Sequence, residues 1–181
     1  GLLYKMSYTE IKRTSGEMLS LVGINENDNR PVKTFSGGMK RRLMIARALM
    51  HKPMVVFLDE PTVGLDATTR RKLWILLRKI NNNGATILMT THYIEEAESL
   101  CDMVGIIDLG RLIAFDTPKN LIKSVGRIVV DEMTEKGIKG HFFLGRKEAS
   151  SFVEHAKGSA LVREANLEDV FLELTGKRVN Q

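Results

Sequence analysis

The chain has 181 residues, of which 43% are hydrophobic and 27% charged, a balance that allows a globular fold with a core of useful size. The single cysteine, Cys101, excludes an internal disulfide framework and favours a reducing compartment. No apolar run reaches the roughly 20 residues that a membrane-spanning helix needs. We therefore expect any role at a membrane to come through a partner.

The net charge of +5 is unevenly spread, because residues 33–52 carry basic residues and no acid. Such a run is compatible with a nucleic-acid patch or with a helix that has one solvated basic stripe. Stacking on bases needs interleaved aromatic residues, and Phe35 is the only one in this run. We favour the solvated stripe and expect no nucleic-acid partner.

The N-terminal part of the sequence predicts helices that need a neighbouring surface. Apolar residues before position 25 are separated by polar ones, which favours helical pieces, and residues 25–31 (NENDNRP) have the composition of a loop. Ser36 is a good N-cap for a helix that runs through Met39–Met50, and Pro53 closes this helical region.

Two apolar runs, Val55–Leu58 and Ala85–Thr91, predict strands that are buried on both faces. Each run precedes a predicted helix, the amphipathic Thr68–Asn81 after the first and Tyr93–Leu100 after the second. The order strand, helix, strand, helix indicates a parallel sheet, so we expect an α/β fold.

The remaining sequence predicts a hairpin and then a small α+β appendage. Residues 103–116 read as two strands that turn at Leu109-Gly110, and Thr117 caps a helix that starts at Pro118. From Gly126 onward short apolar runs alternate with helical patterns. We therefore expect three parts: a helical subdomain at 1–52, an α/β core segment at 53–125 and an α+β extension at 126–181.

The run VVFLDE ends in two acids, Asp59 and Glu60, at the carboxyl end of a predicted parallel strand, where α/β sheets place their ligands. A carboxylate here suits a magnesium ion that bridges phosphate oxygens, which is the role we expect for Asp59. Glu60 is positioned to act as a general base toward water. The alternative is a strand that ends in solvent.

Two further features favour phosphate chemistry. Ser36, Gly37 and Gly38 precede a helix, so backbone N–H groups, a hydroxyl and the positive helix end are available to an anion. His92 follows the second strand and is expected at the same sheet edge as Asp59 and Glu60. An ordinary N-cap and a structural histidine are the alternatives. Cys101 and the other histidines show no zinc-site spacing, and we assign them no role. These histidines are His51, His141 and His155.

Taken together, four motifs resemble those of ATP-binding-cassette (ABC) ATPases, in the family's order. FSGGM resembles the signature motif, VVFLDEP the Walker B strand with its catalytic glutamate, VGLD the D-loop and TTH the switch-histidine loop. The resemblance covers at least residues 30–120, and the tail NLEDVFLELTGK is similar to the end of drug-export ATPases of the daunorubicin-resistance type. The signature departs from the family pattern at Phe35 and Met39, where leucine and glutamine are commoner.

The resemblance implies a P-loop NTPase sheet with a helical subdomain, in an ATP-hydrolysing subunit that binds ATP and Mg2+ and powers a membrane exporter. Two such subunits sandwich two ATP molecules and bind membrane-spanning permease subunits at the cytoplasmic side of the membrane. The implied roles are contact with the partner's ATP by Ser36, Gly37 and Gly38, metal binding by Asp59, catalysis by Glu60 and His92, and a link between the two sites by Asp66. The alternatives are an ABC ATPase of translation or DNA repair and a non-catalytic interaction domain.

One motif of the family has no match in the chain. A phosphate-binding loop has the pattern G-x-x-x-x-G-K-[ST] between a strand and a helix. The segments that start at Gly105 and Gly140 come near it but have arginine in place of lysine and lack the hydroxyl residue. We therefore expect the Walker A motif and the glutamine loop to lie upstream of residue 1, and the chain to be inactive by itself.

Overall fold

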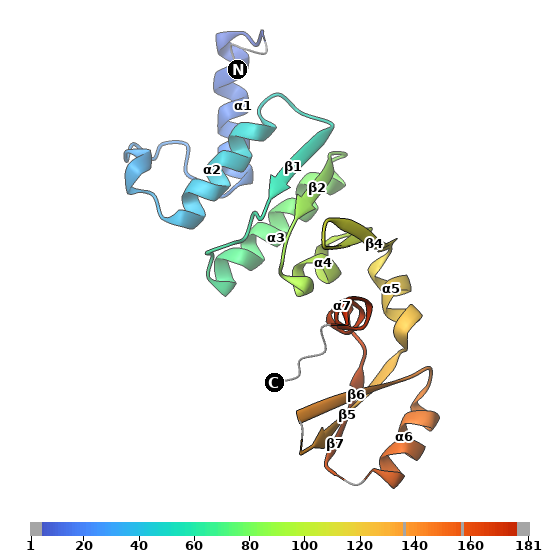
Figure 1. Ribbon diagram of the computed structural model, residues 1–181. Helices are drawn as coiled ribbons and strands as arrows, with labels where there is room; N and C mark the ends of the chain where they lie inside the picture. The colour runs from blue at the N-terminus through green and yellow to red at the C-terminus, as the bar shows by residue number, and fades with distance from the viewer. Residues whose placement is uncertain (1–4, 136, 157, 177–181) are drawn as a thin grey trace. The chain divides into compact units, whose positions relative to one another are not determined.

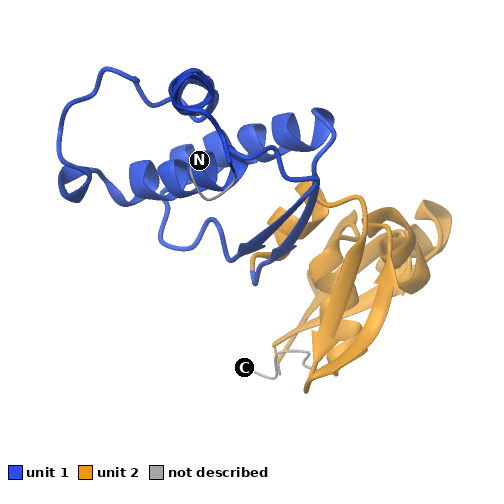
Figure 2. Ribbon diagram, turned by 90° about the horizontal axis from the view of Figure 1, so that it is seen from above, with its two compact units in different colours: residues 1–92 blue, residues 93–181 orange. Residues whose placement is uncertain are grey.

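The computed structural model describes residues 5–135, 137–156 and 158–176 (Figure 1). The chain forms two compact units, residues 1–92 and 93–181, which are coloured separately in Figure 2. None of the helices in the described residues is long and apolar enough to cross a membrane. The boundaries expected after residues 52 and 125 stay a prediction.

The first unit begins with two helices that pack against each other, α1 (Tyr8–Leu21) and α2 (Gly37–Leu49). A capping box between Ser7 and Glu10 starts α1, and a short 3-10 turn, η2 (Val32–Thr34), precedes α2. Arg42 of α2 donates from Nη1 to the carbonyl oxygens of Val22 (2.8 Å) and Gly23 (3.2 Å). The guanidinium thereby fixes the end of α1 to the middle of α2.

The second half of this unit is a parallel strand pair with a helix on one face, as Figure 1 shows. Strand β1 (Val55–Asp59) pairs with β2 (Thr86–Thr90), and α3 (Ala67–Asn82) connects them. The apolar stripe of α3 is buried at helical spacing: Leu73, Leu76, Leu77 and Ile80. The predicted parallel α/β arrangement is confirmed.

The expectation that both strands are buried on both faces is wrong. Val56 is buried, but Phe57 of β1 and its register partner Leu88 of β2 are 74% and 59% exposed. Successive residues of a strand point to opposite faces, so a continuous apolar run needs cover on both. Within the described residues, α3 covers one face, and the other keeps its apolar side chains in solvent.

The second unit starts with α4 (Ile94–Leu100), the hairpin of β3 (Val104–Asp108) and β4 (Arg111–Asp116), and α5 (Pro118–Val125). The predicted hairpin turn is confirmed, because Leu109 and Gly110 both have positive φ, 47° and 74°, as a tight turn of this kind requires. The last helix, α7 (Leu167–Thr175), returns to this hairpin. The shared core consists of Val104, Ile106, Leu121, Leu167 and Val170.

The rest of this unit is an antiparallel sheet of order β6-β5-β7, with α6 (Arg146–His155) packed on it. Its strands are β5 (Ile128–Thr134), β6 (Gly137–Phe143) and β7 (Ala160–Glu164). The strands predicted in this region are present, although β5 and β6 are longer than their apolar runs. His141 of β6 contacts Glu132 (Nε2 to Oε2, 3.1 Å) and packs against Phe152, with the ring centroids 4.3 Å apart and the planes tilted by 39°. These contacts indicate a structural role for His141.

Arg163 of β7 connects the sheet to α7. Its guanidinium donates to Asp131 of β5 (Nε to Oδ2, 2.6 Å) and, through two nitrogens, to Asp169 of α7 (2.7 and 2.8 Å). Hydrogen bonds to Asp169 above all, and also to Asp131, raise the pKa of Arg163 above its ordinary value. Asp169 is 5% exposed and also accepts a bond from the Asn166 backbone at the start of α7. The charged cluster therefore holds α7 in place.

We predict that Asp169→Ala destabilises the second unit by about 3 kcal/mol, because it leaves a partly buried guanidinium without its main partner and removes a helix cap. Faster amide hydrogen exchange at Val129 and Val130 of β5 measures the loss. Glu168→Ala, an exposed acid of the same helical turn, is the matched control and should change exchange little. Equal effects of the two substitutions would contradict the assignment.

Candidate functional site

The carboxyl ends of β1 and β2 lie side by side, because the two strands pair in parallel with Asp59 opposite Thr90. The Thr90 hydroxyl donates to Asp59 Oδ1. The backbone N–H of Glu60 donates to the carbonyl oxygen of Thr90 (3.1 Å) and to its hydroxyl oxygen (3.2 Å). The register of the sheet thus fixes both acids against the end of the second strand.

His92 and Glu60 face each other at this edge. Nδ1 of His92 lies 3.0 Å from Oε2 of Glu60, and the two side chains remain 57% and 42% exposed. The pair is therefore both oriented and open to water. The structure brings Asp59, Glu60 and His92 together, which the sequence led us to expect from the ends of two parallel strands.

Sequence reasoning missed Thr90. Thr90 forms hydrogen bonds with both acids and so organises the site, although the sequence shows it only as part of the TTH motif. Thr90 is the last paired residue of β2 and lies opposite Asp59, a register that the sequence alone does not give.

The Ser36-Gly37-Gly38 segment forms the start of α2, with Ser36 as the N-cap. The Ser36 hydroxyl oxygen accepts a bond from the Met39 N–H (3.2 Å), so it already satisfies one end group of the helix. A Cβ at Gly37 would meet nothing within 4 Å, whereas a Cβ at Gly38 would lie 2.6 Å from Cγ2 of Thr69. Gly37 therefore leaves open space beside the helix end, and Gly38 permits close packing on the start of α3.

Asp66 is the N-cap of α3. Its carboxylate accepts bonds from the Thr69 N–H (2.9 Å) and the Thr69 hydroxyl (2.6 Å), and these bonds hold the pKa of Asp66 below its ordinary value. Thr69 is also the residue that approaches Gly38. The starts of α2 and α3 are therefore connected through Asp66 and Thr69.

The side chains at this edge suit a magnesium ion, which needs few protein ligands, better than a metal ion that is held by protein ligands alone. Within the described residues, no group of three or more His, Cys, Asp and Glu side chains could hold a metal ion. Mg2+ usually takes one or two carboxylates and completes its shell with water and substrate phosphates. Asp59, a carboxylate oriented by a hydroxyl at the end of a strand, fits that pattern.

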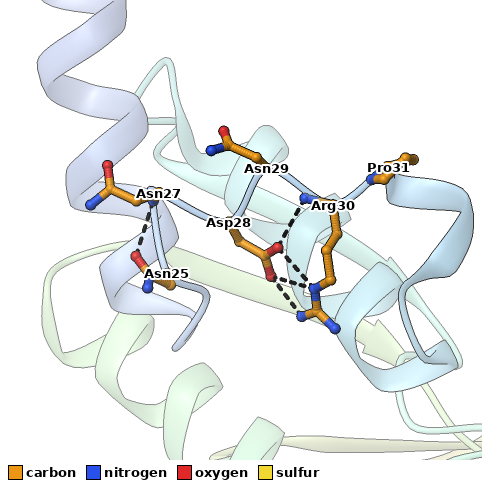
Figure 3. Close-up of a pocket in the computed structure, with 6 residues that line it drawn as sticks. All are labelled: Asn25, Asn27, Asp28, Asn29, Arg30 and Pro31. Carbon is orange, nitrogen blue, oxygen red and sulfur yellow. Dashed lines mark hydrogen bonds and ion pairs between the residues drawn. The ribbon is translucent and has the colours of Figure 1, made fainter.

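A separate hollow of about 770 Å³ lies in the loop between α1 and α2 (Figure 3). Its lining residues are Asn25, Asn27, Asp28, Asn29, Arg30 and Pro31. Asp28 accepts bonds from the Arg30 guanidinium (2.7 and 2.9 Å) and its backbone N–H (3.1 Å), which lower the pKa of Asp28 to about 2. These contacts are local to the loop, and they stiffen its turn.

Comparison with known proteins supplies the family. Residues 4–63 match the family model described as ABC transporter. The linearmycin resistance ATP-binding protein LnrL of Bacillus subtilis is 35% identical, over 98% of this chain and 67% of that protein. The Nod factor export ATP-binding protein I of Cupriavidus metallidurans is 38% identical, over 99% of this chain and 66% of that protein.

Solved structures agree with the fold. An ATP-binding cassette of an ABC transporter in its ADP conformation superposes with a TM-score of 0.60 at 22% identity, over 66% of this chain and 47% of that chain. A dimeric cassette in a post-hydrolysis state with ADP and Pi has a TM-score of 0.55 at 31% identity, over 62% and 49%. The chain thus spans about two thirds of these curated relatives and about half of the solved cassettes.

We predict a pH dependence at the start of α3. Because the pKa of Asp66 is lowered, its capping contribution is complete above the unfolded value near 3.8 and is lost as the pH falls through the lower folded value. In an acid titration followed by NMR, the Thr69 amide shift should move with a midpoint below pH 3.8, and Asp66→Asn should abolish the transition. A midpoint at or above 3.8 would contradict the hydrogen-bonded cap.

Proposed function

The chain belongs to the ABC transporter family of ATP-binding proteins, and from this premise we propose that it carries the hydrolytic part of an ATPase subunit that powers an exporter. The relatives are named for linearmycin resistance and for Nod factor export, which supports outward transport. Their names favour export over the translation and DNA-repair alternatives. The organised acids and histidine favour catalysis over a purely structural interaction domain.

The observation that carries the proposal is the parallel register that sets Glu60 beside His92 and Asp59 beside Thr90. In the proposed reaction, the Glu60 carboxylate accepts a proton from the water that attacks the terminal phosphate. His92 lies 3.0 Å from this carboxylate and so can orient it. In the proposed reaction, the same ring would also contact the terminal phosphate. Asp59 would hold Mg2+, which supplies charge neutralisation to phosphate oxygens when bound.

Binding of ATP needs a phosphate-binding loop, which these residues do not contain. The pattern G-x-x-x-x-G-K-[ST] is absent from all 181 residues, so the proposed reaction requires a phosphate loop from outside these residues. We call an ATPase subunit that contains these residues together with such a loop the complete subunit. In it, the Asp59–Glu60–His92 edge supplies the metal-binding and proton-accepting groups.

The proposed partners are a second ATP-binding subunit and membrane permeases, which would place the assembly at the cytoplasmic side of the membrane. The start of α2 would contact the ATP of the second subunit, with Ser36, Gly37 and Gly38 at the interface. The open space beside Gly37 supports this role, because an anion can approach the helix end there. The dimeric relative that carries ADP and Pi supports the pairing of two subunits. Asp66 would join the two sites through Thr69.

We predict that Glu60→Gln in the complete subunit lowers ATP turnover by about a hundredfold or more, because the amide cannot accept the proton. Affinity for ATP should be retained, since the substitution leaves the shape of the site unchanged. Turnover is measured by phosphate release and affinity by titration with a fluorescent ATP analogue. Glu95→Gln, an exposed acid on α4, is the matched control. Wild-type turnover by Glu60→Gln would overturn the assignment of the base.

A further inference from the structure

Arg41 connects helix α2 to the backbone of the proposed catalytic residue. Its side chain is partly buried, and Nη2 donates to the carbonyl oxygen of Glu60 (2.6 Å) while Nε donates to that of Pro61 (2.9 Å). One planar guanidinium thus binds two successive carbonyl groups directly after strand β1. A lysine, with a single ammonium group, cannot reproduce this forked contact.

The backbone that Arg41 holds is strained. Glu60 has a φ of 43°, in the left-handed region that residues with a Cβ rarely adopt. Such a conformation persists only where surrounding contacts over-determine it. Thr90 supplies those contacts on the N–H side of Glu60, and Arg41 together with the Val63 N–H (3.3 Å) supplies them on the carbonyl side.

We propose that Arg41 is a positioning residue for hydrolysis, which keeps the Glu60 backbone in its left-handed conformation and so directs the Glu60 carboxylate toward His92. The inference rests on the proposed function, because it takes Glu60 as the base. Without the guanidinium, the Glu60 peptide loses one of the contacts that fix it, and the carboxylate loses its fixed direction.

The neighbouring basic residues show that this contact is specific to Arg41. Arg42 points to the end of α1, where it binds the Val22 and Gly23 carbonyl groups, and Lys40 is exposed. The three adjacent basic residues therefore serve different surfaces. Arg41 alone of them joins the turn after β1, five residues along the chain from Ser36.

The contact has a consequence for the two proposed sites of one chain. Helix α2 begins at the Ser36-Gly37-Gly38 segment that is proposed to meet the partner's ATP, and Arg41 lies one turn further along the same helix. A rigid helix and a two-pronged hydrogen bond thus connect that segment to Glu60. Displacement of α2 changes the support of the catalytic carboxylate.

The test compares Arg41→Gln, Arg41→Lys and the control Lys40→Gln in the complete subunit, with Glu60→Gln as the reference. We expect Arg41→Gln to lower kcat about tenfold or more with little change in KM, because misplacement of a catalytic group costs rate rather than binding. Arg41→Lys should recover part of kcat through one carbonyl contact. Lys40→Gln should match the wild type.

A second readout uses the 181-residue chain and needs no activity. The amide–Hα coupling of Glu60 and the carbonyl carbon shifts of Glu60 and Pro61 should change in Arg41→Gln but not in Lys40→Gln. An unchanged kcat, an equal loss in Lys40→Gln or an unchanged Glu60 coupling would each overturn the inference. If Glu60→Gln itself retains turnover, the proposed function fails, and the NMR comparison alone decides whether Arg41 holds the Glu60 backbone.

Discussion

The parallel register of β1 and β2 is the constraint on which the site depends. It sets Asp59 opposite Thr90, and every later contact of the site follows from that pairing: the hydroxyl on Asp59, the two bonds to the Glu60 N–H and the approach of His92 to Glu60. A shift of one residue would send these side chains to the opposite face. The burial of α3 on one face of the pair stabilises this register. The geometry of the two acids therefore depends on the hydrophobic core of the first unit.

Helix α2 is the second organising element, because its polar side chains reach in several directions. Arg42 fixes the end of α1, Arg41 fixes the turn at Glu60, and Gly38 allows Thr69 at the start of α3 to approach. The proposed contact with a partner's ATP and the proposed hydrolytic group are therefore connected inside one compact unit. In the second unit, Arg163 has a comparable structural role, since its hydrogen bonds connect the antiparallel sheet to helix α7.

Local sequence patterns predict many of the helices, strands and turns of this fold. Features that depend on contacts between distant segments could not be predicted from the sequence. The apolar spacing of α3, the Leu109-Gly110 turn and the two parallel strands could be read from the sequence, because each depends on neighbouring residues. The sequence also placed Glu60 and His92 at one edge. It could not show the contacts of Arg41 or Thr90, since neither a basic residue in a basic run nor the first threonine of TTH carries a sign of which carbonyl or carboxylate it meets. The sequence predicts too much burial for β1. Its apolar composition indicates a strand that needs cover on both faces, but the described residues cover only one face.

The most direct test of the central claim, that these residues hold the hydrolytic edge but no phosphate loop, is calorimetric titration of the 181-residue chain with Mg-ATP. We expect no binding tighter than about 1 mM, because anion contacts at one helix end and one carboxylate supply little affinity without a phosphate-cradling backbone. Asp59→Ala is the control and should give the same trace. Tight binding that is lost in Asp59→Ala would show a phosphate site within this chain and would contradict the division of the site described above.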